Sequence, residues 1–503
     1  MNSYYFDEGH ELFRESLRAF LQKEVTPNID QWEEDQRIPR DVWEKMGKMG
    51  FLGLSYPEEF GGSNLDFFYD VIFCEEIAKV FSGGFAITQA VVQYMSGPYI
   101  LKYGSQRLKE KYLPGIISGE AISCIGISEP TAGSDVANIR TTAVLEGDHY
   151  IVNGSKTFIT NAIYGDFVVC VVKTDPKAGP DGVSLLIVDL DKEGVSKTKL
   201  KKLGWHSSDT AELAFDNVKI PKENLIGEEG KGFYYLMGGL QVERLAGAIM
   251  GYSACEVAME YTLQYMSERS AFGRPINKFQ VLRHRMAQLA SEIESCKQFV
   301  LHCSRLNADG KYAVKECSMA KLLATELSDK TMTQCLQSFG GYGYIEDFKI
   351  ARMFRDSRIG TIGGGTSEIM REIIAKMVID DVSYKQANNN NNSKSNKNNK
   401  NGNIMSNLES VLEAIQTKAE QADSLNNTLK FNFGEEQLYI DGTGDKNQVS
   451  IEDKAADCQV DVSFDDFLAL TKGELNPMSA VMGGKIKIKG DMGVAMKLQS
   501  LFS

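Results

Sequence analysis

The stretch GFYYLMGGLQVERLAGAIM, at residues 232–250, decides how this sequence is interpreted. Its apolar residues recur at intervals of three and four, a spacing that predicts an α-helix. The single acidic residue of the stretch is Glu243, which Arg244 follows directly. An acidic residue in the middle of so apolar a helix either pairs with another polar group or takes part in chemistry.

Two glycines flank Glu243 at the distance of one helical turn. Gly239 and Gly247 lie four residues before and after it, so they are its neighbours on the helix surface. A glycine inside a helix costs about 1 kcal/mol relative to alanine, and glycines around one carboxylate indicate close approach by a ligand or another helix. The alternative is a solvated glutamate that pairs with an arginine on a tightly packed helix. Taken alone, this stretch allows both interpretations.

A second glycine cluster, IGGGT at residues 362–366, predicts a flexible loop that leads into a helix. Thr366 is suited to cap that helix. Free N–H groups and the positive end of the helix dipole favour an anionic or carbonyl oxygen at such a place. An ordinary glycine turn with a threonine cap is the plainer alternative.

The first three quarters of the chain change from helices to strands and back to helices. Residues 1–125 are expected to be helical, with an apolar stripe formed by Phe6, Leu12, Phe13, Leu17, Phe20 and Leu21. Residues 126–225 are expected to form a β domain, with strand-like runs at 167–172 and 183–188. Within YIVNGSKTFI, at 150–159, the Asn153-Gly154 pair predicts a hairpin turn. Residues 226–384 return to helical spacing.

The last quarter begins with an asparagine-rich tract. Residues 388–403 contain ten Asn, a composition that cannot bury enough apolar surface to offset its ordering entropy. We therefore expect residues 385–404 to be a disordered linker. Residues 405–503 are long enough for another domain, with an amphipathic helix over 408–415 and strands over 428–433 and 437–440.

Composition excludes some classes of function. The chain has 503 residues, of which 43% are hydrophobic and 24% charged, as in ordinary globular proteins with several domains. A net charge of −13 argues against a general nucleic-acid binder, which needs a basic face. No uninterrupted apolar run reaches the length of a membrane span.

Cysteine and histidine spacing indicates neither a disulfide framework nor a metal site. The nine Cys are irregularly spaced without a Cys-x-x-Cys, and the five His are scattered. From the first residues, MNSYYFDEGHE, we expect neither a secretory nor a good transit peptide. The last four residues, SLFS, are not a peroxisomal address of the Ser-Lys-Leu type.

Further segments carry a family resemblance. They are IGISEPTAGSD at 125–135, KTFITN at 156–161, HSSDTAEL at 206–213, ERSAFGRP at 268–275, QSFGG at 337–341 and RDSR at 355–358. In this order, over residues 5–382, they resemble the acyl-CoA dehydrogenase family. The segments GFYYLM and QVERL are most similar to the long-chain branch of this family. Isovaleryl-CoA dehydrogenases have the catalytic carboxylate at the same position as that branch.

The resemblance implies a multidomain fold. It consists of an all-α N-terminal domain, a central β-barrel or sandwich and a C-terminal α-helical bundle. It also implies FAD as cofactor, acyl-CoA as substrate, an electron-transfer flavoprotein as electron acceptor and a homotetramer. No Gly-x-Gly-x-x-Gly follows a strand, which weakens a nicotinamide alternative.

The resemblance also assigns site residues. Contacts with or beside the flavin ring fall on Ile125, Ser128, Phe158, Ile159 and Thr160. Contacts with the adenosine diphosphate fall on Arg269, Phe272 and Gln280, and on Gln337 and Gly341 of a neighbouring subunit. Thr366 and Glu368 complete the cofactor set. Contacts with the substrate fall on Ser134, Arg244, Gly364 and Gly365.

Position 364 departs from the commoner family pattern, which has the catalytic carboxylate there. The resemblance therefore implies that Glu243 is the catalytic base. Without Glu243 the chain would have no evident base, and a homologue that only binds its ligand is the alternative.

Residues 405–503 resemble a sterol carrier protein type-2 domain. The matching segments are AADC at 455–458, DFLALTKG at 466–473, NPMSA at 476–480 and GDMGVAMKL at 490–498. That family has a small α/β fold around a lipid-accepting tunnel, which implies a lipid or acyl-CoA ligand. The methionines Met478, Met482, Met492 and Met496 suit either a lipid surface or core filling.

The leading hypothesis is FAD-dependent oxidation of acyl-CoA to trans-2-enoyl-CoA, with a tethered lipid-binding domain. An oxidase-like enzyme that passes electrons to oxygen is one alternative. A lipid carrier whose dehydrogenase part is only a scaffold is another. The mitochondrial matrix and the peroxisome both suit the chemistry, and no targeting signal decides between them.

Overall fold

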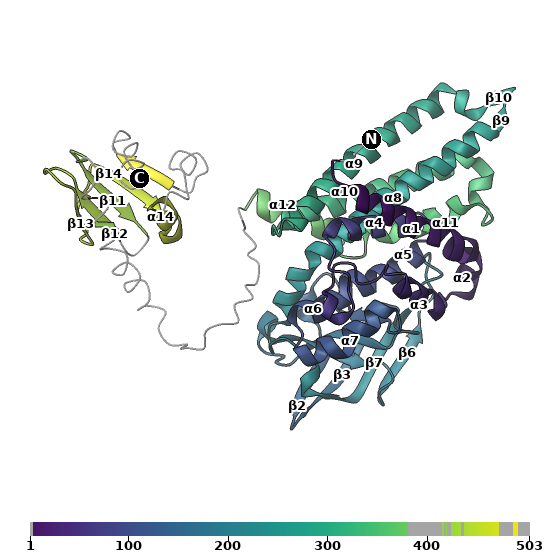
Figure 1. The fold of residues 1–503 in the computed structure, drawn as a ribbon, viewed down its shortest axis with the longest axis horizontal. Helices are drawn as coiled ribbons and strands as arrows, with labels where there is room; N and C mark the ends of the chain where they lie inside the picture. Colours follow the sequence, from purple (N-terminus) through teal and green to yellow (C-terminus); the bar gives the residue numbers. More distant parts are fainter. Residues whose placement is uncertain are drawn as a thin grey trace. The chain divides into compact units, whose positions relative to one another are not determined.

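The computed structural model of the chain describes residues 4–380, 382, 415–416, 419, 424–433, 437–471 and 486–490. The chain divides into two compact units, residues 1–389 and 390–503, each described by itself (Figure 1). The linker predicted for 385–404 lies outside the described residues, as do the four methionines of the last domain and residues 408–414 of its predicted helix.

The first unit opens with helices, as predicted. They are α1 (Glu8–Phe20), α2 (Ile29–Asp35), α3 (Arg40–Lys48), α4 (Phe67–Ala78), α5 (Gly83–Ala90), α6 (Gly97–Tyr103) and α7 (Gln106–Ser118). Asp7 caps α1 by accepting from the His10 N–H. Leu17 and Leu21 of the predicted stripe are buried, but Leu12 is 61% exposed because it falls on the opposite side of α1.

A sheet of eight strands follows. The strands are β1 (Ser123–Gly126), β2 (Thr142–Glu146), β3 (His149–Thr160), β4 (Phe167–Lys173), β5 (Val183–Asp189), β6 (Val195–Lys199), β7 (Thr210–Pro221) and β8 (Leu225–Ile226). Their order is β6-β7-β3-β2-β4-β5-β8, and β1 pairs with β4 in parallel. In β4, Val169 and Val171 join the core shared with the helices, while Val168 and Val172 join the core of the sheet's other face. Burial on both faces explains its uninterrupted apolar run.

The hairpin predicted at Asn153 and Gly154 is wrong. Both residues lie inside β3, which continues to Thr160 beside β7. A Cβ on Gly154 would lie 2.6 Å from the Thr141 Cα, so this glycine serves a close backbone approach and a register shift in the sheet. The real turn joins Glu146 to His149, with Gly147 at φ 64°.

A helical bundle completes the first unit. It contains α8 (Gly232–Glu268), α9 (Gln280–Ala308), α10 (Val314–Phe339), α11 (Lys349–Ser357) and α12 (Ser367–Val378), with a small hairpin of β9 (Ser270–Ala271) and β10 (Arg274–Pro275). The 37 residues of α8 span about 55 Å. Helices α8 and α10 run side by side in the same direction, because Arg244 contacts Ser318 and Tyr265 stacks on Phe339.

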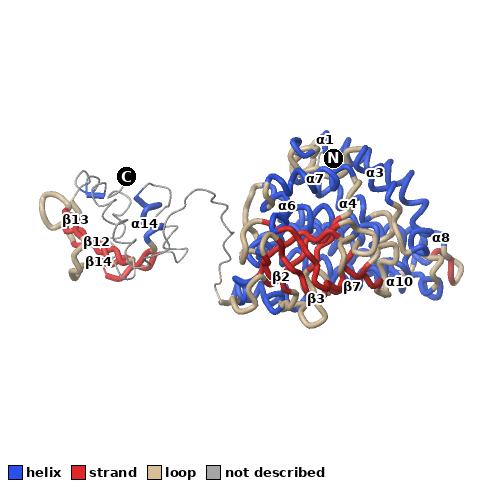
Figure 2. The backbone as a smooth tube through the Cα atoms, turned by 90° about the horizontal axis from the view of Figure 1, so that it is seen from below, coloured by secondary structure: helices blue, strands red, loops and turns tan. Residues whose placement is uncertain are grey.

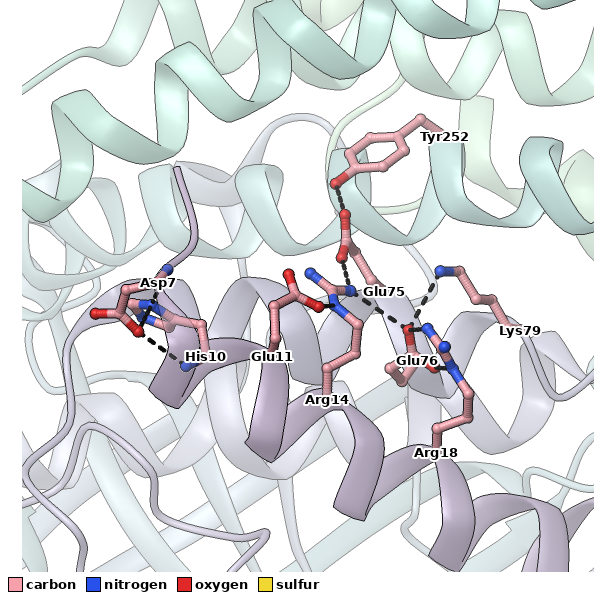
Figure 3. A network of polar contacts seen from close by, with 9 residues as sticks. All are labelled: Asp7, His10, Glu11, Arg14, Arg18, Glu75, Glu76, Lys79 and Tyr252. Atoms are coloured by element: carbon pink, nitrogen blue, oxygen red, sulfur yellow. Dashed lines mark hydrogen bonds and ion pairs between the residues drawn. The ribbon is translucent and has the colours of Figure 1, made fainter. Parts of the chain in front are cut away.

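A buried polar network ties α1 and α4 to α8 (Figure 3). Arg14 of α1 pairs with Glu75 of α4, and the Tyr252 hydroxyl of α8 donates to Glu75 at 2.6 Å. Next to this pair, Glu76 accepts from Arg18 at 2.8 Å. Glu76 also accepts from Lys79 at 3.2 Å. Glu75 and Glu76 are each 2% exposed, so the network brings two carboxylates into the interior beside positively charged partners.

The second unit contains a five-stranded sheet, shown with its strands in red in Figure 2. Its strands are β11 (Thr428–Asn432), β12 (Gln437–Asp441), β13 (Gln448–Ser450), β14 (Cys458–Val462) and β15 (Ile486–Gly490), in the order β13-β12-β11-β14-β15. Helix α14 (Phe464–Thr471) packs Phe467 against Phe431 of β11. The strands predicted over 428–433 and 437–440 are present.

Candidate functional site

Glu243 is buried in α8 and accepts one strong hydrogen bond. The Tyr99 hydroxyl, from α6, donates to its Oε1 at 2.6 Å. Burial raises the pKa of Glu243 to about 7, although the Tyr99 hydrogen bond and the Arg244 charge act in the opposite direction. A carboxyl with a pKa near 7 can exchange a proton with a ligand at neutral pH.

The two glycines beside Glu243 have different surroundings. A Cβ on Gly239 would lie 2.3 Å from the Tyr99 hydroxyl oxygen, so glycine is needed for Tyr99 to reach Glu243. The close approach predicted there is therefore made by another helix. Apart from the adjoining residues and backbone of its own helix, no atom of the described residues lies within 4 Å of the Cβ position of Gly247, which leaves open space on the next turn after Glu243.

Arg244 turns toward α10. Its guanidinium donates to the Ser318 hydroxyl at 3.3 Å, and burial lowers its pKa despite the neighbouring Glu243. Its Nε is buried and has no hydrogen-bond partner among the described residues. A cationic group with an unused donor is thus held one residue from the buried acid.

The glycine loop at 363–365 is anchored to α10. Lys321 donates from its Nζ to the Gly365 carbonyl at 2.5 Å. The helix predicted after this loop is α12, and the Thr366 hydroxyl caps it by accepting from the Ile369 N–H at 3.3 Å. Both Gly364 and Gly365 have positive φ values, 66° and 98°, which other residues rarely adopt.

The glycine loop and the buried acid belong to one neighbourhood. Arg244 contacts Ser318 and Gly251 packs on Ala324, so Lys321 of α10 lies level with the α8 turn between them. The charge of Arg244 also acts on Lys321, which requires the two side chains to be near each other. Residues 243–247 and the loop at 363–366 are therefore both tied to one stretch of α10, through Ser318 and Lys321.

The segments 125–135 and 156–161 are also brought together. The Thr157 N–H donates to the Ser128 carbonyl at 2.9 Å. Beneath this contact, the wholly buried Lys156 pairs with Glu129 at 2.7 Å, which locks the loop to β3. Ile125 lies in β1, and Ser134 lies on the exposed part of the loop.

Phe158 stands out in this second group. It is 71% exposed and has a φ of 62°, at a register irregularity between Lys156 and Ile159. Ile159 is buried, and Thr160 ends the strand opposite Thr210. A large aromatic side chain held in solvent by a strained backbone offers a surface for a flat ring system.

The remaining predicted residues lie at the far end of the bundle. Arg269 and Phe272 follow α8, Gln280 begins α9, and Gln337 and Gly341 lie at the end of α10. Arg269 lies over the Tyr342 ring at 5.7 Å, so the two sets are neighbours within one subunit. Beside them, an open hollow of about 410 Å³ is lined by Gln280 and the basic residues Lys278, Arg283 and His284.

This third group of residues, which consists of Arg269, Phe272, Gln280, Gln337 and Gly341, lies far from Glu243 within the subunit. Arg269 follows Glu243 by 26 residues, or about 39 Å along a continuous helix. The described residues hold no group of His, Cys, Asp or Glu arranged to bind a metal ion. No helix in the described part of the chain has the length and apolar character needed to cross a membrane.

Comparison with known proteins agrees with this arrangement. Residues 7–120, 124–218 and 230–379 match the N-terminal, middle and C-terminal domains of acyl-CoA dehydrogenases, and residues 408–503 match the SCP-2 sterol transfer family. The long-chain specific acyl-CoA dehydrogenase of mouse mitochondria is 40% identical over 381 residues, or 75% of this chain and 88% of the relative. The chain belongs to the acyl-CoA dehydrogenase family.

Two further proteins are similar to this acyl-CoA dehydrogenase over the same share of its chain. The mitochondrial isovaleryl-CoA dehydrogenase of rice is 36% identical over 75% of this chain and 92% of its own. The crystal structure of an acyl-CoA dehydrogenase from Geobacillus kaustophilus has a TM-score of 0.74 and 45% identity, over 75% of this chain and all of its own. The expected order of helical, β and helical domains is thus confirmed, with an SCP-2 domain added at the C-terminus.

Acyl-CoA dehydrogenases are FAD-binding flavoproteins, and the residues of this chain fit that cofactor. Phe158 presents an aromatic face beside the loop at 125–135, and the hollow near Gln280 collects three basic side chains suited to phosphate groups. Sequence reasoning missed Tyr99, Ser318 and Lys321. Only Lys321 had a signal, a lysine within the apolar run MAKLLA at 319–324.

Proposed function

We propose that this chain oxidises acyl-CoA to trans-2-enoyl-CoA, with Glu243 as the base that removes the α-proton. The C–H bond at the α-carbon breaks toward Glu243, and the β-hydrogen leaves with its electron pair as the double bond forms. Bound FAD supplies the acceptor for that hydride. The observation that carries the proposal is a buried carboxyl that accepts from Tyr99 and has a pKa near 7, with open space one helical turn away at Gly247.

In this proposal, the glycine loop donates hydrogen bonds to the thioester carbonyl. No acceptor among the described residues takes the N–H of Gly364 or Gly365. Donors that face the carbonyl oxygen stabilise the negative charge that develops when the α-proton departs. Arg244 adds a positive charge beside the base, and Ser134 on the exposed loop would contact the CoA portion.

Anaerobic titration with straight and branched acyl-CoAs tests the function directly. We expect the flavin absorbance to bleach as substrate is added, and the preferred chain to emerge from the comparison. Long-chain and isovaleryl-type substrates are the two classes to compare. A flavin that stays oxidised with every acyl-CoA would favour the lipid-carrier alternative.

Tyr99→Phe should move the pH dependence of flavin reduction without abolishing it. The Tyr99 hydroxyl stabilises the ionised form of Glu243, so its loss should raise the pKa of the base further above 7. Because the base acts when deprotonated, the rising limb of the rate should shift to higher pH by about one to two pH units, from roughly 1.5–3 kcal/mol per charged hydrogen bond. Stopped-flow reduction across a pH series measures this midpoint.

Tyr103→Phe is the matched control for Tyr99→Phe. Tyr103 lies on the same helix, and its buried hydroxyl has no hydrogen-bond partner among the described residues. Its midpoint should stay at the wild-type value. Equal shifts in both variants would show that helix α6 has moved and would remove the direct role of Tyr99.

Assembly into a homotetramer, or at least a dimer, follows from the third group of residues. Arg269 and Phe272 lie too far from Glu243 to serve the same flavin, so we assign them, with Gln337 and Gly341, to the cofactor of a neighbouring subunit. Phe272 is 96% exposed and Tyr344 is 91% exposed, as expected of a contact surface. Light scattering that found a monomer with full flavin occupancy would refute this assignment.

An electron-transfer flavoprotein is the proposed electron acceptor. Oxygen consumption with peroxide formation by the purified protein would favour the oxidase-like alternative. The compartment is a separate matter: the mouse and rice relatives are mitochondrial by name, and the peroxisome suits the same chemistry. Fractionation of cells that express the chain decides between the two.

The SCP-2 domain should help to capture long acyl chains and leave the chemical step alone. A flexible linker of 16 residues would span roughly 20–24 Å, which corresponds to effective concentrations of order mM. Deletion of 388–503 should preserve flavin content and turnover at saturating short substrate, and should raise KM for long chains only. Equal loss for both would show a role in folding, and no loss would make the domain an independent lipid binder.

A further inference from the structure

Lys321 is an unusual lysine. It is 3% exposed, although lysines are seldom buried without a charged partner. No carboxylate of the described residues comes within 4 Å of its Nζ, and burial together with Arg244 lowers its pKa to about 8. The partner that its ammonium group has is the Gly365 carbonyl, at 2.5 Å. The hydrogen bond to this backbone carbonyl therefore offsets part of the free-energy cost of burying the ammonium group.

That contact lies at the one part of the glycine loop that lacks other support. The start of the loop is held by the Gly363 N–H, which donates to the Ile359 carbonyl at 2.8 Å. Its end is held by the Thr366 cap. Between them, two glycines with positive φ have no side chain to restrict them, and glycine has the largest backbone freedom to lose.

The anchored carbonyl is tied to α10, the helix that Arg244 also contacts through Ser318. The charges of Arg244 in α8, Glu368 in α12 and Glu326 in α10 all act on the ammonium group of Lys321. The Gly365 carbonyl shares its peptide plane with the Thr366 N–H, so the Lys321 hydrogen bond fixes that plane. The same hydrogen bond thereby fixes the end of the segment formed by Gly364 and Gly365, which carries the N–H groups without an acceptor among the described residues.

We propose that Lys321 is a positioning residue for the reaction: its ammonium group holds the Gly365 carbonyl and so keeps in place the loop whose Gly364 and Gly365 N–H groups donate to the substrate carbonyl. The inference rests on the proposed dehydrogenation. Lys321 does not touch the reacting atoms and acts only through the loop. It therefore affects the rate of the chemical step more than the folding of the bundle.

The test compares Lys321→Met and Lys321→Gln with Lys330→Met in the full-length holoenzyme. Lys330 lies on the same helix, is solvent-accessible and pairs with Glu292 at 2.7 Å. We expect Lys321→Met to lower the limiting rate of flavin reduction roughly 10- to 100-fold, the worth of a charged hydrogen bond. Flavin content should stay at the wild-type level. Lys321→Gln, which keeps a donor, should recover part of the rate, and Lys330→Met should behave as wild type.

Two readouts separate positioning from general stability. Amide hydrogen exchange of the substrate-free protein should become faster at Ile362 and Gly363, whose N–H groups donate to the Ile359 carbonyl, in Lys321→Met and stay unchanged in α8. The wild-type rate should also fall above about pH 8 as Lys321 loses its proton, and this limb should be absent in Lys321→Met.

Unchanged exchange at Ile362 and Gly363, or an unchanged rate, would overturn the proposal, as would equal losses in Lys330→Met. The exchange experiment needs no substrate. It therefore still decides the role of Lys321 as an anchor if wild-type flavin fails to bleach, a result that would count against the proposed dehydrogenation instead.

Discussion

Glu243→Gln should slow flavin reduction by roughly 10²–10⁴-fold, the usual contribution of general-base catalysis. The amide has nearly the shape of the carboxyl and keeps an oxygen that can accept from Tyr99. Flavin content and ligand binding should therefore stay close to wild type. Anaerobic stopped-flow mixing with saturating acyl-CoA measures the rate, and flavin absorbance per protein measures the content.

Glu260→Gln is the control, because Glu260 is an exposed acid on the same helix. Its rate should not change. Near-normal reduction by Glu243→Gln would remove Glu243 from the mechanism. The paired variant Glu243→Gly with Gly364→Glu should recover part of the activity, since the family uses both positions for its carboxylate. No recovery would indicate a differently shaped acyl pocket or the strain of a side chain at the positive φ of position 364.

Arg14→Met should destabilise the first unit by about 3–5 kcal/mol, the usual cost of removing one partner of a buried ion pair. Arg14 neutralises Glu75, which is 2% exposed and, among the described residues, would keep only the Tyr252 hydroxyl as a hydrogen-bond partner (Figure 3). All three tryptophans, Trp32, Trp43 and Trp205, lie in this unit, so urea unfolding followed by tryptophan fluorescence reports on it alone.

Two companion variants test the reason for this loss. Arg18→Met removes a half-exposed arginine from the same network and should cost about 1 kcal/mol or less. Arg14→Met combined with Glu75→Gln removes both charges and should recover most of the stability. A double variant as unstable as Arg14→Met alone would show that the lost packing of the arginine stem, and not the unpaired charge, is responsible.

The succession of domains was predictable because it follows from local periodicity. Apolar spacing of three and four predicted the helices on either side of the sheet, and the uninterrupted apolar runs predicted β4 and β5. The linker composition and the SCP-2 segments likewise depend only on neighbouring residues. The turn at Asn153 and Gly154 failed because the same pair suits a tight turn and a close backbone approach, and only the neighbouring Thr141 decides between them.

The sequence by itself determined the class of this protein, the order of its domains and the identity of the acid at position 243. Only the tertiary structure decided how the pKa of that acid is shifted and what anchors the loop at 363–365. Tyr99 is 144 residues from Glu243 in the chain, and Lys321 is 44 residues from Gly365. Periodicity and motifs carry no information on such contacts, because they arise when separate helices pack, and it is this packing that removes water and shifts the pKa of Glu243.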